Sequence, residues 1–188
     1  MRAGFADPVT EAQAAFRAAM DALARPGRVQ CVAGPEAPPP LAPAAAALLL
    51  ALADADTPVW TDAGPEAEAW IAFHTGAPLV PAPGAAAFLL AAGPMPPLAT
   101  LAAGTDEAPQ EGATLIQQVA ALTPGAGWGL AGPGIATTAR LGVEGLPADF
   151  PAQWAANAAR FPRGVDLFLC AGAALAAFPR TLRLDGAR

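Results

Sequence analysis

The stretch VDLFLCAGAALAAFPRT, residues 165–181, decides the fold because two apolar runs lie on either side of a small-residue turn. This pattern predicts two strands joined by a tight turn. Upstream, GATLIQQVAAL (112–122) is the best candidate for another strand, although an alanine-rich apolar run can also be helical. GWGLAGPGI (127–135) is predicted to pair with it as a hairpin, and the GPG sequence at 132–134 breaks that strand.

A first helix is predicted over residues 10–24. Thr10 and Gln13 have the spacing of a capping box, Val9 is placed for a hydrophobic staple, and the Arg-Pro-Gly sequence at 25–27 ends the helix. Phe16, Met20 and Leu23 share its apolar face, and Phe16 and Met20 are expected in the core.

Helical and extended segments alternate along the rest of the chain. Helices are predicted over 42–53, 64–76 and 147–160, with a shorter one over 95–103. Short strands are predicted over 28–32, after the turn within 54–60, at 79–80 and at 87–90. Helices interleaved with strands predict a three-layer α/β fold, a mixed β-sheet flanked by helices, in a single domain over residues 1–188.

Composition and charge exclude several classes of protein. The net charge is −6 and no basic run is present, which argues against nucleic-acid binding. The longest apolar stretch, 41–53, is too short to span a bilayer, and no secretory signal pattern is present. Cys31 and Cys170 are far apart in the sequence and lie in strand-like runs, so buried thiols are expected rather than a disulfide. These features predict a cytoplasmic protein without membrane or nucleic-acid partners.

The residue types that are missing exclude most self-sufficient mechanisms. The chain has no lysine, no serine and no tyrosine, and His74 is its single histidine. A Schiff-base lysine, a serine nucleophile with its triad and a P-loop lysine are therefore excluded. One histidine and two separated cysteines do not make a usual zinc site, so no metal and no cofactor are expected.

Two acidic residues lie between a predicted helix and a predicted strand. Asp54 and Asp56 could hold a divalent cation or act in proton transfer. The favoured interpretation is a turn in which these carboxylates bond nearby backbone amides, because such turns are common.

The remaining candidates are one histidine and three arginines with their neighbours. His74 and Thr75 lie at the end of a predicted helix, where the helix dipole would stabilise the ring, and a ligand-binding role is an equal alternative. Arg163 and Arg180 each follow a Phe-Pro pair that restricts the guanidinium, and arginine grips phosphate or phosphonate oxygens with two parallel hydrogen bonds. The residues that complete this set of candidate ligand-binding or interface positions are Asp166, Thr181 and Arg17.

Seven segments in order resemble one known family over almost the whole chain. They are AFRAAMDALARPG (15–27), LLLALADADTPVW (48–60), FHTGAPLV (73–80), EGATLIQQVAAL (111–122), GPGI (132–135), FPRGVDLFL (161–169) and FPRT (178–181). The family is the H subunit of the bacterial carbon–phosphorus lyase core complex. The poorer matches are residues 35–40 and 91–103.

The resemblance implies a role in organophosphonate catabolism. The complex displaces adenine from a nucleoside triphosphate and joins an alkylphosphonate to ribose C1, which gives a ribose 1-alkylphosphonate 5-triphosphate. The resemblance also implies a fold like the large domain of pyridoxal-phosphate-dependent transferases without the cofactor site, a homodimer, and sister subunits G, I and J. The alternatives are a stand-alone small-molecule enzyme that uses His74 with an aspartate, and a purely structural adaptor.

Overall fold

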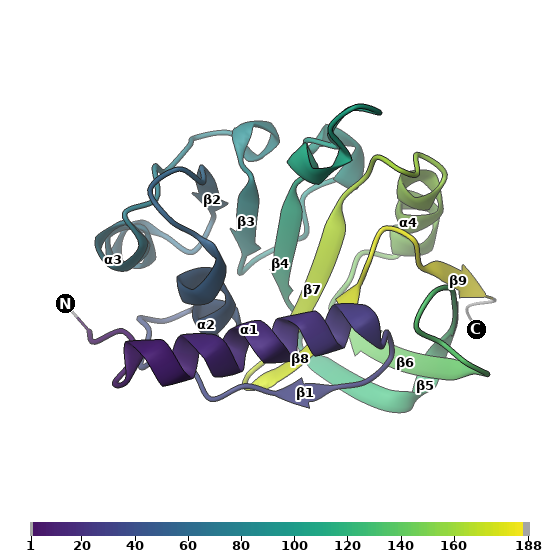
Figure 1. Ribbon diagram of the computed structural model, residues 1–188, viewed down its shortest axis with the longest axis horizontal. Coiled ribbons are helices and arrows are strands. Elements are labelled where there is room, and N and C mark those ends of the chain that lie inside the picture. The colour runs from purple at the N-terminus through teal and green to yellow at the C-terminus, as the bar shows by residue number, and fades with distance from the viewer. Residues whose placement is uncertain (1, 186–188) are drawn as a thin grey trace.

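A six-stranded mixed sheet forms the middle layer of the molecule. The computed structural model describes residues 2–185 and is shown in Figure 1. The strand order is β1-β8-β7-β4-β3-β2, in which β2, β3, β4 and β7 are parallel while β8 and β1 are antiparallel to their neighbours. The strands are β1 Gln30–Cys31, β2 Val59–Thr61, β3 Phe88–Ala91, β4 Thr114–Gln118, β7 Asp166–Ala171 and β8 Ala174–Phe178. The predicted mixed sheet between helical layers is confirmed.

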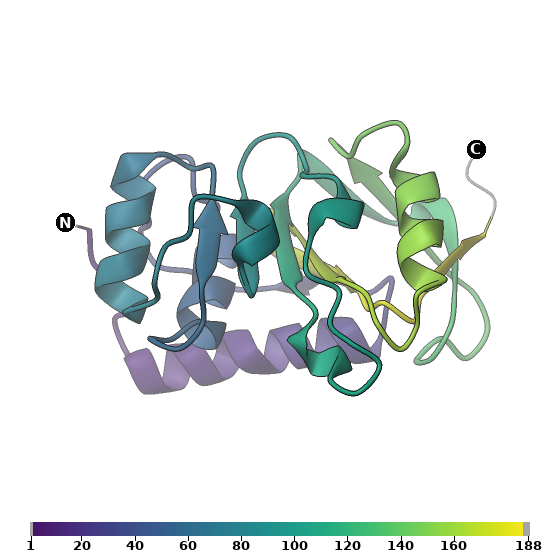
Figure 2. The same cartoon turned by 90° about the horizontal axis from the view of Figure 1, so that it is seen from above.

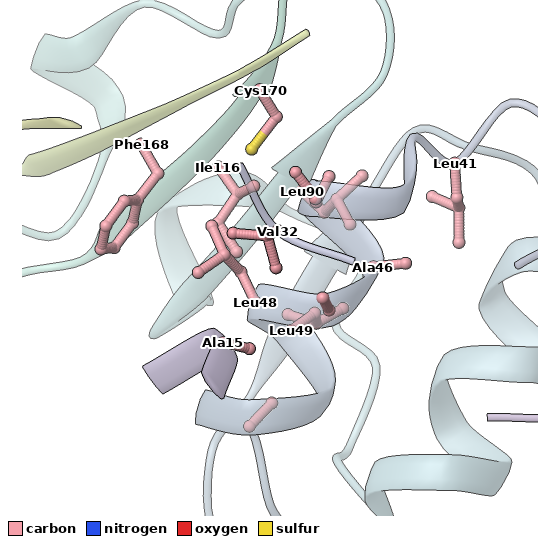
Figure 3. Packing of buried hydrophobic residues seen from close by; sticks show 14 of the residues in the cluster. Ala15, Val32, Leu41, Ala46, Leu48, Leu49, Leu90, Ile116, Phe168 and Cys170 are labelled. Atoms are coloured by element: carbon pink, nitrogen blue, oxygen red, sulfur yellow. The ribbon is translucent and has the colours of Figure 1, made fainter. Parts of the chain in front are cut away.

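The first core lies between one face of this sheet and three helices, α1 Pro8–Ala24, α2 Pro43–Leu52 and α3 Pro65–Thr75. Figure 3 shows sheet residues such as Ile116, Phe168 and Cys170 pointing toward Leu48 and Leu49 of α2. Many of the facing helix residues are alanines, so α1 and α2 approach the sheet closely.

The second core covers the opposite face of the sheet. Neighbouring strand residues alternate between the two faces, so Leu115 points into this core while Ile116 points into the first. The far wall consists of α4 Phe150–Ala158 and a three-stranded antiparallel sheet of order β6-β5-β9, with β5 Ala121–Ala131, β6 Ala139–Glu144 and β9 Arg183–Asp185. Phe150, Trp154 and Phe178 pack together in its centre.

Helix α1 corrects two predictions about its start. The N-cap is Asp7 and not Thr10, because Pro8 takes the first helical position and the Asp7 side chain accepts the Thr10 N–H. Glu11, and not Gln13, reaches back to the Asp7 N–H at 3.0 Å. Val9 is 69% exposed, which does not fit the predicted staple.

The buried face of α1 also differs from the predicted one. Phe16 is 48% and Met20 is 52% exposed, so the prediction that they lie in the core is wrong. The side chains that α1 buries against the sheet and α2 are Ala15, Ala19 and Ala22. Side-chain size misled the prediction, because close packing at this contact requires the small residues.

The predicted hairpin between 112–122 and 127–135 is wrong. Residues 112–122 contain β4 in the central sheet and the first residues of β5 in the second sheet. Residues 127–131 continue β5, which pairs with β6 and β9. A bulge between Pro124 and Trp128, with positive φ at Gly125 and Gly127, lets one strand continue across the glycine-rich sequence.

The other predicted elements agree better with the structure. Helices α2, α3 and α4 lie within the predicted 42–53, 64–76 and 147–160, and β7 and β8 form the predicted hairpin around Gly172, whose φ is 59°. Of the helix predicted over 95–103, only one 3₁₀ turn at Leu98–Thr100 forms. Further 3₁₀ turns are Pro83–Ala85 and Pro109–Glu111. None of the helices within residues 2–185 is both long and apolar enough to cross a membrane.

Candidate functional site

Arg180 holds three separate segments together at the start of β7. Its backbone N–H and its Nε and Nη2 donate to the carboxylate of Asp166 at 2.7, 3.1 and 2.6 Å. Its Nη1 donates to the carbonyl oxygens of Pro109 and Pro162 at 2.6 and 3.4 Å. The side chain is only 13% exposed. These contacts engage all three guanidinium nitrogens, so the observed arrangement is a structural clamp.

Arg163 lies next to this clamp. Its Nε is 3.1 Å from Oδ1 of Asp106, an ion pair without hydrogen-bond geometry, and both side chains are well exposed. Arg163 is therefore freer to change partner than Arg180. The structure thus brings the predicted residues Arg163, Asp166 and Arg180 together.

Thr181 follows the clamp and lines a cleft of about 820 Å³. One wall of the cleft is α4, with Trp154 and small residues such as Ala158. The rim carries the exposed Phe161 and Arg183. The lining is mostly apolar, which suits a hydrophobic partner group better than a bare phosphate.

His74 and Thr75 lie at the other end of the molecule. They belong to the last turn of α3, beside the β2 edge of the sheet, whereas Arg163 follows α4 at the opposite end (Figures 1 and 2). The His74 Nε2 and the Trp70 Nε1 both lie 3.1 Å from the carbonyl oxygen of Arg2, and Thr75 Oγ1 donates to the Ile71 carbonyl. His74 therefore tethers the N-terminal segment, and a single cleft containing it and both arginines does not form.

The acidic turn forms around Asp54, which bears out the favoured interpretation for one of its two carboxylates. Asp54 Oδ1 accepts the Asp56 N–H at 3.0 Å, and Thr57 bonds to both the backbone and the carboxylate of Asp54. Among residues 2–185, no three His, Cys, Asp or Glu side chains group closely enough to hold a metal ion. Arg17, the remaining candidate, is exposed on α1 beside Phe16.

A polar cluster at the carboxyl ends of β2, β3 and β4 was not predicted. Asp62 directly follows β2 and accepts the N–H groups of Ala92 and Gly93 at 2.7 and 3.1 Å. The Gln117 Nε2 donates to the Gly93 carbonyl, while its buried Oε1 has no partner among the described residues. A cleft of about 570 Å³ opens beside Gly93 and Gln118. The position of these residues in the sequence could have predicted the cluster, because residues at the carboxyl ends of parallel strands share one edge of the sheet.

Burial decides the chemistry of the two cysteines. Cys31 is exposed, so the prediction of a buried thiol is wrong there, whereas Cys170 is buried in the first core as predicted. Burial raises the pKa of the Cys170 thiol, since the interior penalises the thiolate. Cys170 is thus a packing residue.

Comparison with known proteins gives a consistent result. The family described as bacterial phosphonate metabolism protein (PhnH) matches residues 3–185. The chain is 43% identical over 187 residues to a protein of Rhizobium meliloti (strain 1021) named alpha-D-ribose 1-methylphosphonate 5-triphosphate synthase subunit PhnH, with 96% of this chain and 94% of the relative covered. It is 38% identical over 101 residues to the putative C-P lyase subunit protein HtxG of Stutzerimonas stutzeri, with 54% of this chain and 52% of the relative covered.

Proposed function

The chain belongs to the PhnH family of bacterial phosphonate metabolism proteins, and from this premise we propose that it is a subunit of the carbon–phosphorus lyase core complex. In that role it supports formation of a ribose 1-alkylphosphonate 5-triphosphate from a nucleoside triphosphate and an alkylphosphonate. The observation that carries the proposal is the 43% identity to a named synthase subunit over nearly the full length of both chains.

The local chemistry of the polar residues supports a role within an assembly. The Arg180 guanidinium is hydrogen-bonded to Asp166, and the His74 ring is hydrogen-bonded to the backbone of the N-terminal segment. With no lysine, serine or tyrosine in the sequence, few pairs of nucleophile and base are available within one chain. The proposed subunit therefore acts with residues that its partners donate.

The proposed partners are a second copy of this chain and the sister subunits G, I and J. Large apolar side chains that a partner could cover are exposed on three helical regions, with Phe16 and Met20 on α1, Phe73 on α3 and Phe161 after α4. Isolated exposed apolar residues are ordinary, but several on one small domain suit a subunit with more than one neighbour. We place the assembly in the cytoplasm, and we propose that the fold is related to the large domain of pyridoxal-phosphate-dependent transferases without the cofactor site.

Co-expression tests the proposed assembly. The chain is produced together with the G, I and J subunits of its own source, and the mass of the purified particle is measured by light scattering. We expect one particle that contains all four chains. Elution of this chain apart from the other three would contradict the proposal.

An activity assay tests the proposed reaction on the same samples. We expect release of adenine from a nucleoside triphosphate in the presence of methylphosphonate by the four-chain particle, and none by this chain alone. The matched control is the particle expressed without this chain. Adenine release by the isolated chain would support the alternative of a stand-alone enzyme.

A further inference from the structure

Strand β9 is an open edge that faces the cleft of about 820 Å³ beside α4. The order β6-β5-β9 leaves β9 paired with β5 alone among the strands of residues 2–185. All three residues of β9 line the cleft; Arg183 and Asp185 are exposed and Leu184 is half-buried. The edge is therefore accessible along its length, and an accessible edge strand is a template for another strand.

The backbone groups of Leu184 point into this cleft. A Cβ atom on Gly129 of β5 would lie 3.1 Å from the Asp185 carbonyl oxygen, so Asp185 directs its backbone groups toward β5. The Leu182 carbonyl oxygen points the other way and accepts the Trp154 Nε1–H of α4 at 2.9 Å. Because successive residues of a strand direct their backbone groups to alternate sides, the N–H and the carbonyl of Leu184 face α4. Neither group bonds to α4 or to a loop within residues 2–185.

Helix α4 forms the opposite wall of the cleft and leaves room for one strand. The residues of that wall are mostly small, with Ala155, Ala158 and Ala159 among them. Figure 1 shows α4 beside β9, on the side away from β5 and β6. A strand added to β9 lies about 4.8 Å from it, between β9 and α4. The β9 strand of a second copy would bring its own β5 into the place of α4, so the cleft suits a single extended segment.

The side chains of β9 determine the chemistry of such a segment. Leu184 packs against the second core, whereas Arg183 and Asp185 are exposed and form no ion pair within residues 2–185. A residue of an antiparallel segment directly opposite Leu184 exchanges both backbone hydrogen bonds with it, and its side chain lies on the same face as the Leu184 side chain. The residues before and after it lie beside Asp185 and Arg183, where a basic and then an acidic side chain are complementary.

We propose that the groove between β9 and α4 binds an extended segment of a partner subunit, which adds to β9 as an antiparallel strand and has the sequence pattern basic–apolar–acidic. This inference rests on the subunit role proposed above and assigns one surface to it. The backbone hydrogen bonds to Leu184 supply affinity, and the apolar cleft and the two exposed charges supply specificity. Because Leu184 alone offers outward backbone groups within β9, a single register satisfies them.

A synthetic peptide tests the groove on the isolated full chain. The probe is a blocked pentapeptide of threonine, lysine, valine, glutamate and threonine in that order, and its dissociation constant is measured by NMR titration. Methylation of the valine nitrogen removes its N–H and should raise this constant on the order of tenfold. No binding of the probe, or an equal constant for the methylated probe, would overturn the proposal.

Exchange of the charges tests the direction of the added strand. A second probe, with lysine and glutamate exchanged, should bind the wild type more weakly than the first probe does. It should bind the double variant Arg183→Glu/Asp185→Arg more tightly than the first probe does, because both opposite-charge pairs are then restored. The same preference in both proteins would contradict the antiparallel register.

Filling the groove gives a matched pair of variants. Ala155→Phe places a large side chain in the cleft, whereas Ala156→Phe places it at an exposed position of the same helix outside the cleft. Ala155→Phe should abolish binding of the first probe and lower the amount of this chain that co-purifies with the G, I and J subunits, and Ala156→Phe should do neither. Circular dichroism melts establish that both variants are folded.

The two readouts separate this inference from the proposed function. A particle that retains the Ala155→Phe chain as fully as the wild type overturns the groove as a contact between subunits. A wild-type chain that does not assemble with the G, I and J subunits overturns the subunit role and, with it, the partner proposed for the groove. In that case the peptide titration still decides whether the groove binds a strand.

Discussion

At the residue scale, the polar side chains that looked most like ligand-binding groups stabilise the fold. Arg180 joins β7 to the loop that contains Pro109 and to the turn after α4. Asn157 also links two segments, since its side chain both donates to the Val165 carbonyl and accepts the Val165 N–H. Such buried contacts are costly to remove, because each leaves an unpaired polar group.

The clamp predicts a difference between the two arginines. Arg180→Ala leaves Asp166 and two carbonyl groups without their donor, and should lower the free energy of unfolding by about 2–4 kcal/mol. Arg163→Ala removes an exposed ion pair and should lower it by less than about 1 kcal/mol. Urea unfolding of both variants measures the difference. Equal effects would mean that Arg180 is not the structural residue of the pair.

The two thiols should react differently. Cys31 is exposed and Cys170 is buried with a raised pKa, so a thiol reagent should modify one cysteine in the folded protein and both in denaturant. Because the folded-state pKa of Cys170 is raised, its stabilising effect is complete below the thiol pKa of the unfolded chain and declines as the pH rises above it. Cys31→Ala should abolish modification of the folded protein. Rapid modification of that variant would contradict the burial of Cys170.

At the element scale, local signals were sufficient for some segments and not for others. Helix α3 was predicted because Pro65 begins it and Gly76, with φ of 71°, ends it, and both signals lie in the segment itself. The buried face of α1 was not predicted correctly, because its contacts depend on how closely α2 and β8 approach the helix. Strand β5 was missed because its glycine-rich bulge resembles a turn.

The close packing of α1 predicts how side-chain size on its two faces affects stability. Ala19→Leu adds a large side chain to a filled contact and should lower the free energy of unfolding by about 1–3 kcal/mol. Phe16→Gln replaces an exposed side chain and should change it by no more than about 0.5 kcal/mol. Thermal unfolding of the two variants compares them. If Phe16→Gln is the more destabilising change, the buried face of α1 is the one that the sequence first suggested.

At the scale of the whole molecule, the central sheet separates two cores of different character. The first core is rich in alanine, while the second contains the aromatic cluster of Phe150, Trp154 and Phe178. The layers were predictable from the alternation of helices and strands. The residues Arg163, Asp166 and Arg180 were predicted as candidates from the sequence. Their clamp was not, because Arg180 also contacts the carbonyl of Pro109, 71 positions away, and sequence spacing does not reveal such a partner.

This architecture predicts an order of protection from hydrogen exchange. Amides of β4 and β7 should exchange most slowly, since both strands are paired on two sides and covered by both cores. Amides of the short outer strands β1 and β9 should exchange faster. Mass spectrometry of peptides from these strands measures the order, and protection of β9 as strong as that of β4 would contradict it.

The separation of the two cores has an optical consequence. Trp70 is the tryptophan within the first core, whereas Trp154 lies in the second and Trp60 and Trp128 pack against it. A Trp70→Phe variant would therefore fluoresce from the second core alone, and its denaturation curve could be compared with that of the wild type. Superimposed curves would mean that the shared sheet makes both halves unfold as one unit, and separated curves would identify the half that opens first.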